Sequence, residues 1–263
     1  RPSTALKINR RKARPHRNHP RTSLLSALQS GRERPVRFFE QRTALAEHRF
    51  GMEENMKLYL IRHGRQCSRL CNVNVSLDEA GKRQAQLAGM RLKDSGIEEI
   101  YASDLLRARE TAGIINDSLQ VPLKICSGIR EISFGEMEGL TDEEIDRKFG
   151  TFKSEFSRME RDLPYPGGEC AGDVVKRALP VFQEIFDSGL SRAAMVTHGG
   201  VIRCMTAYFL GMDLARWRSL GKSLENCSIT ELEYRKETGM VTVERFNDYA
   251  HLEAFPELLR RNW

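Results

Sequence analysis

The sequence predicts an α/β fold, a domain in which helices cover a mainly parallel sheet. Two short apolar runs carry this prediction: residues 57–61, which lead into His63, and residues 193–196, which lead into His198. A run of four or five β-prone apolar residues, closed by glycine and followed by a helical pattern, is typical of a buried parallel strand. Each predicted strand therefore delivers a histidine at its carboxyl end.

The two histidines predict one shared site. Ligands of open α/β sheets bind in the crevice beyond the carboxyl ends of the strands. A single histidine at a strand end is more often structural, but glycine follows each of these two, as Gly199 follows His198, and a helix then begins. Such a glycine lets the backbone approach a ligand, and the helix N-terminus favours an anion. We therefore expect Gly199 and the guanidinium of Arg62 to contact phosphate or carboxylate oxygens.

A second arginine is placed by the same reasoning. Residues 97–101 predict a short strand, and Ser103 is the expected N-cap of the next helix, with Asp104 in its first turn. The apolar face of that helix comprises Leu105, Ala108, Ala112, Ile115 and Leu119. Arg107 lies off this face near the strand ends, so we expect it to bind the ligand, whereas Arg109 reads as a solvated charge.

Two further patterns complete the predicted sheet and its surroundings. Residues 226–232 and 240–245 alternate in polarity on either side of a turn, which predicts two more strands. Asp78 is the expected N-cap of a helix that follows the first histidine. We expect His251 to pack or cap rather than to belong to the site.

Five strings in the chain match one known family. They are LIRHG, SDLLRARETA, REISFGEMEGL, PGGE and VTHGG, in this order and with compatible gaps. Together they resemble the histidine phosphatase superfamily, also called phosphoglycerate mutase-like, over about Met56 to Leu252. The resemblance implies a three-layer α/β/α sandwich with a mainly parallel central sheet.

The resemblance also implies roles for individual residues. His63 corresponds to the nucleophile, and Arg62, Arg107 and His198 correspond to the residues that hold the transferred phosphoryl group. Glu131, within the third string, corresponds to the general acid.

These roles agree with the chemistry of the side chains. A neutral imidazole can attack phosphorus and hold it as phosphohistidine, and nearby arginines favour the neutral form of His63. Phosphoryl transfer needs neutralisation of the phosphate oxygens, which two arginines and a second histidine supply in place of a metal. A protonated Glu131 can give a proton to the leaving alkoxide and later take one from water. We therefore expect neither a metal nor another cofactor.

The loop after the first histidine departs from the family pattern. Members commonly have Glu-Thr after the R-H-G string and an asparagine six positions beyond the histidine, where this chain has Arg65-Gln66 and Arg69. Asn72 and Asn74 are the two alternatives for the missing phosphate contact. This loop and the segment between Glu131 and the second histidine are both shorter than in the mutases, which favours a phosphatase.

Charge separates the chain into two regions. Residues 1–51 carry 13 Lys and Arg against 3 Asp and Glu, a net charge of +10, whereas residues 52–263 carry 29 against 33, a net charge of −4. We expect residues 1–51 to be a basic, disordered extension and residues 52–263 to be the phosphatase domain. The extension is either native or translated upstream sequence, with a transit peptide as a lesser alternative. The mildly acidic domain argues against nucleic acid as a partner.

Cysteine usage and hydropathy indicate a cytoplasmic protein. No apolar stretch reaches the length of a membrane span, so we expect no membrane partner. The six cysteines lack C-x-x-C spacing, which favours free thiols in a reducing compartment. Cys67 and Cys71 are close in the altered loop, where a regulatory disulfide is the alternative to free thiols.

The sequence thus predicts a phosphomonoester hydrolase that acts through phosphohistidine on a small phosphorylated metabolite. A phosphoglycerate-type mutase and a catalytically weak phosphoester-binding module are the alternatives. Sugar phosphates, phosphoglycerate and α-ribazole phosphate all fit as substrates, since specificity lies in loops. The oligomeric state stays open.

Overall fold

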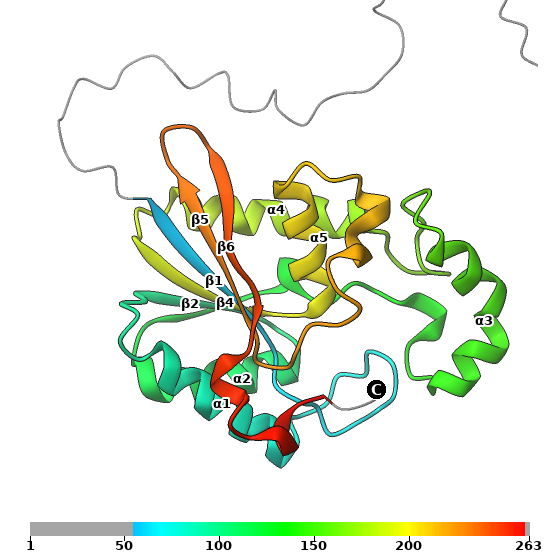
Figure 1. Ribbon diagram of the computed structural model, residues 1–263, viewed down its shortest axis with the longest axis horizontal. Coiled ribbons are helices and arrows are strands. Elements are labelled where there is room, and N and C mark those ends of the chain that lie inside the picture. The colour runs from blue at the N-terminus through cyan, green and yellow to red at the C-terminus, as the bar shows by residue number, and fades with distance from the viewer. Residues whose placement is uncertain (1–54, 261–263) are drawn as a thin grey trace, which may run out of the picture. The chain divides into compact units, whose positions relative to one another are not determined.

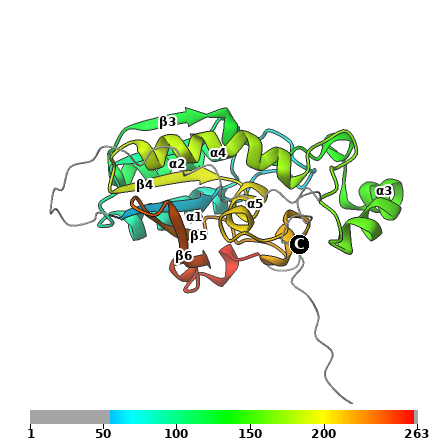
Figure 2. The same ribbon diagram turned by 90° about the horizontal axis from the view of Figure 1, so that it is seen from above.

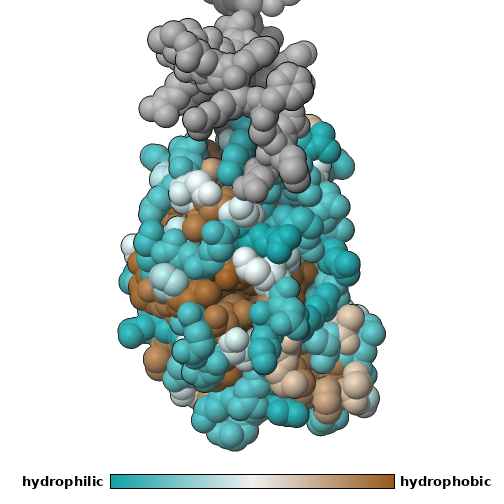
Figure 3. All heavy atoms as spheres, turned by 90° about the vertical axis from the view of Figure 1, so that its left-hand side faces the viewer, coloured by the Kyte–Doolittle hydropathy of each residue, from teal (hydrophilic) through white to brown (hydrophobic). Residues whose placement is uncertain are grey.

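The computed structural model describes residues 55–260 and confirms the three-layer α/β/α fold (Figure 1). The predictions for residues 1–51, and the boundary before Met52, lie outside the described residues. Within residues 55–260, no helix is both long and apolar enough to cross a membrane. Figure 3 shows the face at which β1 begins, where hydrophilic side chains surround a band of apolar ones.

A sheet with the strand order β3-β2-β4-β1-β5-β6 forms the middle layer of the described residues. Its strands are β1 (Met56–Arg62), β2 (Glu99–Ser103), β3 (Leu123–Cys126), β4 (Arg192–Thr197), β5 (Ile229–Arg235) and β6 (Met240–Asp248). β3, β2, β4 and β1 are parallel to one another, and β5 and β6 form an antiparallel edge beside β1. The mainly parallel sheet and the two late strands are therefore as predicted.

Alternate side chains of the central strands face two separate cores, as the period of two in a strand requires. Leu58 and Leu60 of β1 pack into the cluster that also holds residues of α4 (Ala171–Asp187) and α5 (Gly199–Phe209). Ile61 packs instead with residues of α1 (Glu79–Leu92) and α2 (Leu106–Leu119). Figures 1 and 2 show these two pairs of helices on opposite faces of the sheet.

Asp78 is the N-cap of α1, as predicted, because its carboxylate accepts a hydrogen bond of 2.7 Å from the backbone N–H of Gly81. One helix, α3 (Asp142–Ser157), lies outside the layers (Figure 1). Thr141 and Glu144 form a capping box at its start. This helix provides a wall of the site described below.

The predicted cap of α2 was wrong. Ser103 is the last residue of β2, and Leu105 occupies the N-cap position without a side-chain cap. The hydroxyl of Ser103 is instead in a hydrogen bond of 2.8 Å with Nε2 of His198, a tertiary contact that local propensity does not encode. The side chain of Asn74 replaces the cap, since its Oδ1 accepts the N–H of Leu106 at 2.8 Å.

The structure also tests the positions expected for Asp104 and His251. Asp104 precedes α2 rather than lying in its first turn, and its carboxylate binds Arg130 at 2.6 Å. His251 lies outside the site and contacts Arg91 through Nδ1 at 3.1 Å. Arg91 also pairs with Asp248 at the end of β6, so this cluster fastens the chain after the sheet to α1.

Removal of one aromatic ring tests the core between the sheet and α4. Phe182 is fully buried, and its ring lies 5.4 Å from that of Phe209. We expect Phe182→Ala to lower the free energy of unfolding by about 3–5 kcal/mol, because it leaves a cavity. Urea denaturation measures this change. Met90→Ala is the control: Met90 is 65% exposed on α1, and a change of no more than about 0.5 kcal/mol is expected. Equal losses in both variants would contradict this account of the core.

Candidate active site

The structure brings the two predicted histidines together at the carboxyl ends of β1 and β4. These strands are paired in parallel, and the backbone N–H of His63 donates to the carbonyl of Thr197 at 2.9 Å. The ring centroids of His63 and His198 are 5.1 Å apart. Both side chains are buried, with exposed fractions of 4% and 0%.

Hydrogen bonds indicate which nitrogen of His63 is unprotonated. Nδ1 lies 2.8 Å from the carbonyl oxygen of Gly64, which can only accept, so Nδ1 carries the proton. Burial, together with Arg107 and Arg62, holds the pKa of His63 well below its usual range. The ring is therefore neutral, and Nε2 keeps its lone pair. Nε of Arg107 donates to this nitrogen at 3.3 Å.

His198 presents the same pattern of donor and acceptor as His63. Burial and Arg107 hold its pKa well below the usual range, so this ring is neutral as well. Its Nε2 contacts Ser103 Oγ, which also accepts the N–H of Leu105 at 3.3 Å. The hydroxyl proton of Ser103 can then point to Nε2, which leaves the proton of the ring on Nδ1. Within the described residues, this buried Nδ1 has no hydrogen-bond partner.

The loop after His63 holds Arg107 in place. The guanidinium of Arg107, 1% exposed, donates from Nη2 to Oδ1 of Asn72 at 2.8 Å and from Nη1 to the carbonyl of Val73 at 3.1 Å. Asn72 has a φ of 46°, a left-handed conformation that asparagine tolerates better than most residues. Of the two predicted alternatives, Asn72 thus lies at the site and supports an arginine, whereas Asn74 caps α2.

Arg62 and Gly199 lie side by side at the start of α5. The Nη1 of Arg62 donates to the carbonyl of Leu224, but its Nε is buried and has no partner in residues 55–260. A Cβ added at Gly199 would lie 3.6 Å from this Nε. An unpaired buried donor costs about 1–3 kcal/mol. Two such donors, on Arg62 and His198, indicate a place for an anionic ligand.

Glu131 lies at the N-terminus of α5. Its Oε1 accepts the backbone N–H groups of Gly200 and Ile132, each at 3.0 Å. The absence of a side chain at Gly200 makes this contact possible, because a Cβ there would collide with Oε1. The side chain also lines the cavity of the site.

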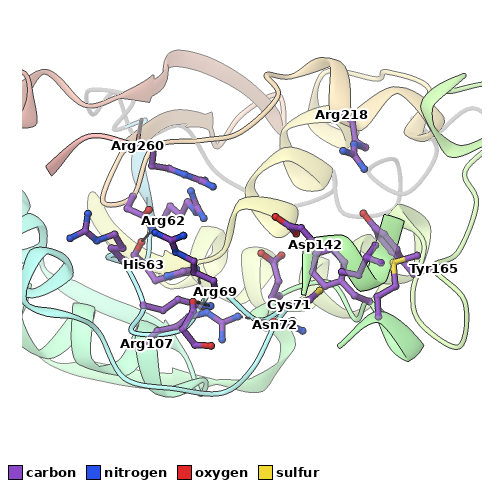
Figure 4. Close-up of a pocket in the computed structure, with 18 of the residues that line it drawn as sticks. Arg62, His63, Arg69, Cys71, Asn72, Arg107, Asp142, Tyr165, Arg218 and Arg260 are labelled. Carbon is purple, nitrogen blue, oxygen red and sulfur yellow. Dashed lines mark hydrogen bonds between the residues drawn. The ribbon is translucent and has the colours of Figure 1, made fainter. Parts of the chain in front are cut away.

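The site opens into a cavity of about 380 Å³ with a strong excess of positive charge (Figure 4). Its cationic lining residues are Arg62, Arg65, Arg69, Arg107, Lys153, Arg218 and Arg260. Glu131 and Asp142 are the carboxylates among the lining residues. The sequence analysis predicted two of these arginines, Arg62 and Arg107, at the ligand site. Arg65 and Arg69 were noted only as departures from a motif, although a basic loop beside the histidine predicted to be the nucleophile was a usable signal.

Arg260 reaches the site from the far end of the chain. Leu258, in the turn η6 (Pro256–Leu258), is buried against α1, and its carbonyl accepts from Gln84 at 2.7 Å. The backbone N–H of Arg260 then donates to both oxygens of the buried Glu225 at 3.2 Å. The cation lies beside Arg62 and helps to lower the pKa values of Arg62 and His63 (Figure 4). No motif marked Arg260 in the sequence.

The six cysteines are free thiols in this structure. Cys71 lines the cavity, where burial and Glu138 raise the pKa of its thiol to about 11, so it is a poor nucleophile at neutral pH. Among residues 55–260, no group of three or more His, Cys, Asp and Glu side chains has the arrangement of a metal site.

Comparisons with known proteins agree with this geometry. Residues 58–248 match the family described as the histidine phosphatase superfamily (branch 1). The chain belongs to this superfamily. It is 27% identical over 216 residues to the "Probable phosphoglycerate mutase GpmB" of Yersinia pestis (strain Pestoides F), a match that covers 78% of this chain and 100% of the relative.

Two solved structures are also similar to this chain. YhfR of Bacillus stearothermophilus is 30% identical, with a TM-score of 0.67 over 75% of this chain and 100% of that protein. The mycobacterial glucosyl-3-phosphoglycerate phosphatase Rv2419c, in complex with inorganic phosphate, is 27% identical, with a TM-score of 0.67 over 74% of this chain and 99% of that protein.

The pKa of His63 gives a direct test of the electrostatics. Because it is lowered, we expect the His63 ring to stay neutral as the pH falls through about 6.5, the ordinary value for histidine. Arg107→Met removes one neighbouring cation and should raise this pKa, while burial keeps it below the ordinary value. Titration of the His63 Cε1–H signal by NMR measures both, with Arg109→Met as the control. An unchanged titration in Arg107→Met would show that the guanidinium does not act on His63.

Proposed function

We propose that this protein is a phosphomonoester hydrolase that transfers a phosphoryl group from a small substrate to His63 and then to water. The observation that carries the proposal is the unprotonated Nε2 of His63 at the base of a cation-rich cavity. Of the two residues with an unpaired buried donor, Arg62 lines this cavity, and His198 lies directly behind it, with its ring centroid 5.1 Å from that of His63. Hydrolases such as Rv2419c among the similar structures support the proposal.

The phosphoryl group is held by four residues. Arg62 and Arg107 supply positive charge, and Nε of Arg62 and Nδ1 of His198 donate to the phosphate oxygens. Gly199 lets the N-terminus of α5 approach the anion, whose charge the helix dipole stabilises. These donors are fixed before the substrate arrives, which is the condition for electrostatic stabilisation of a transition state.

The first step is attack of His63 Nε2 on phosphorus. The bond from phosphorus to the ester oxygen breaks, and Oε2 of a protonated Glu131 gives its proton to the departing oxygen. The ring of His63 gains positive charge, which the Gly64 carbonyl stabilises through Nδ1–H.

The second step returns the enzyme to its initial state. The Glu131 carboxylate takes a proton from water while the water oxygen attacks phosphorus. The bond between phosphorus and Nε2 breaks, and inorganic phosphate leaves. Because Oε1 is held by Gly200 and Ile132, Oε2 is the oxygen that exchanges the proton.

A phosphoglycerate-type mutase is the second candidate, and the similarity to GpmB favours it. A mutase returns the phosphoryl group from histidine to another hydroxyl group rather than to water. The two functions are separated by the fate of labelled phosphate. Release of inorganic phosphate from phosphomonoesters supports the hydrolase, and conversion of one phosphoglycerate isomer to the other, without release, supports the mutase.

Chelation tests the proposal that side chains neutralise the phosphate oxygens. We expect hydrolysis of p-nitrophenyl phosphate to continue in excess EDTA, because Arg62, Arg107 and His198 supply the charge and donors that a divalent cation supplies elsewhere. The initial rate with and without EDTA is the measurement. Loss of the rate on chelation, with recovery on addition of a divalent ion, would contradict the proposed site.

Substitutions at His63 and Glu131 test the two proposed steps separately. His63→Ala removes the nucleophile, so neither hydrolysis nor covalent phosphate is expected. Glu131→Gln keeps the nucleophile but cannot protonate an alkoxide, and alkyl phosphates should react about 10²–10⁴-fold more slowly. With p-nitrophenyl phosphate the first step should suffer less, so acid-labile phosphohistidine should accumulate in Glu131→Gln.

Rapid quench with labelled substrate measures the bound phosphate. Glu136→Gln is the matched control, because Glu136 is exposed on a neighbouring turn outside the cavity lining. Equal losses on both substrates in Glu131→Gln, with no label on the protein, would remove Glu131 from the acid–base role.

A further inference from the structure

The cavity extends well beyond the residues assigned to the phosphoryl group. Arg62, Arg107 and Arg260 gather around His63 at one end of Figure 4, whereas Arg218 and Tyr165 lie at the other. All six side chains line the same cavity of about 380 Å³. This volume lies in the range of about 300–1,000 Å³ typical of sites for whole small molecules. The far end is therefore available for the organic part of a substrate.

An aromatic wall borders this far end. Tyr165 packs against Phe134 and Phe156, with ring centroids 4.7 Å and 5.0 Å apart, and Phe152 of α3 stacks on Phe156 at 5.2 Å. All four side chains line the cavity. A wall of this kind favours an apolar or aromatic group over a bare sugar hydroxyl surface.

Arg218 interrupts this apolar surface with a single positive charge. It lies in the 3-10 turn η4 (Leu214–Ser219), and its guanidinium carbon is 5.1 Å from the ring centroid of Phe156 and 5.9 Å from that of Trp217. Stacking of this kind occupies the face of the guanidinium and leaves its N–H edge for hydrogen bonds.

Arg218 has no carboxylate partner among the residues that the structure describes. In the part of the chain that the structure describes, no Asp or Glu lies within ion-pair distance of its guanidinium. Asp142 lines the same cavity but is not in such a pair with it. Lys153 of α3, which also lines the cavity, is paired with Asp146. Arg218 is thus the cation at this end that is positioned to bind a ligand.

The geometry points to a substrate class: phosphomonoesters whose apolar or aromatic body carries a second anionic group, a carboxylate or a phosphoryl group, that Arg218 binds. This inference rests on the proposed phosphatase function and adds a specificity-determining residue to it. His63 and Arg218 then bind the two ends of one molecule, and the aromatic wall binds the part between them.

Matched pairs of esters test the assignment. One pair is 4-carboxyphenyl phosphate and its neutral amide, 4-carbamoylphenyl phosphate, and a longer pair carries a two-carbon spacer before the carboxylate or amide. We expect the wild-type protein to prefer the carboxylate of at least one pair by about tenfold in kcat/KM, the effect of one charge-assisted hydrogen bond. Arg218→Gln should bring this ratio close to one. The ratio cancels any general effect of the substitution on folding or chemistry.

Two further variants sharpen the comparison. Arg218→Lys keeps the charge without the planar stack and should retain part of the preference. Arg216→Gln, an exposed position in the same turn and outside the cavity lining, should leave the ratio unchanged. Greater turnover of 1,4-phenylene bisphosphate than of the carboxylate ester assigns the site to a phosphoryl group rather than a carboxylate.

A ratio near one for both pairs in the wild-type protein, or a preference that Arg218→Gln retains, would overturn the inference. Calorimetric binding of 4-carboxybenzylphosphonate and its amide, which cannot be hydrolysed, repeats the comparison without turnover. An absence of hydrolysis with all esters would contradict the proposed function, while the binding comparison would still decide the role of Arg218.

Discussion

The burial of two arginines against two neutral histidines is the constraint on which the rest of the site depends. Arg62 and Arg107 lose hydration where no carboxylate pairs with them among the described residues, a costly arrangement unless other groups replace the water. Backbone carbonyls and the amide of Asn72 replace part of that hydration. Nε of Arg62 and Nδ1 of His198 stay unpaired. A bound anion would accept hydrogen bonds from both donors and would thereby stabilise the folded protein. Burial, together with the same positive charges, lowers the pKa of His63 and keeps its ring neutral, so the binding of an anion and the proposed nucleophilicity both depend on this buried, positively charged environment.

The site residues that follow the strand ends could be predicted from the sequence. Other residues around the cavity could not. His63 and His198 were placed at one edge because parallel strands end together, and Arg107 followed from its position in the first turn of α2. Ser103 was predicted to be a helix N-cap from its local preference. Its hydroxyl instead forms a tertiary hydrogen bond with His198, which the local sequence does not encode. Arg260 gave no local signal, since its position depends on the packing of Leu258 and on Glu225.

The aromatic wall, to which α3 contributes Phe152, could not be predicted from the sequence either. The segment between Glu131 and His198 was predicted to be short and to hold parts of two matched strings. The meeting of its aromatic residues was not predicted, because they follow no single helical or strand period. Phe134, Phe152 and Tyr165 meet only once a loop, a helix and a second loop have folded against one another. In this chain the residues proposed to hold phosphate thus lie in compact strings, whereas the aromatic wall of the cavity is spread over irregular segments.

The position of β1 has a consequence for the way the chain folds. β1 is the first strand of the described sheet to be synthesised, yet it pairs with β4 and β5, which follow only after more than half of the described chain. Leu58, Leu60 and Ile61 therefore have no sheet partner while that intervening chain is made. Contacts so distant in sequence slow folding and expose an apolar strand edge to aggregation. The topology that brings His63 and His198 together thus leaves an apolar strand without its sheet partner until β4 has been synthesised.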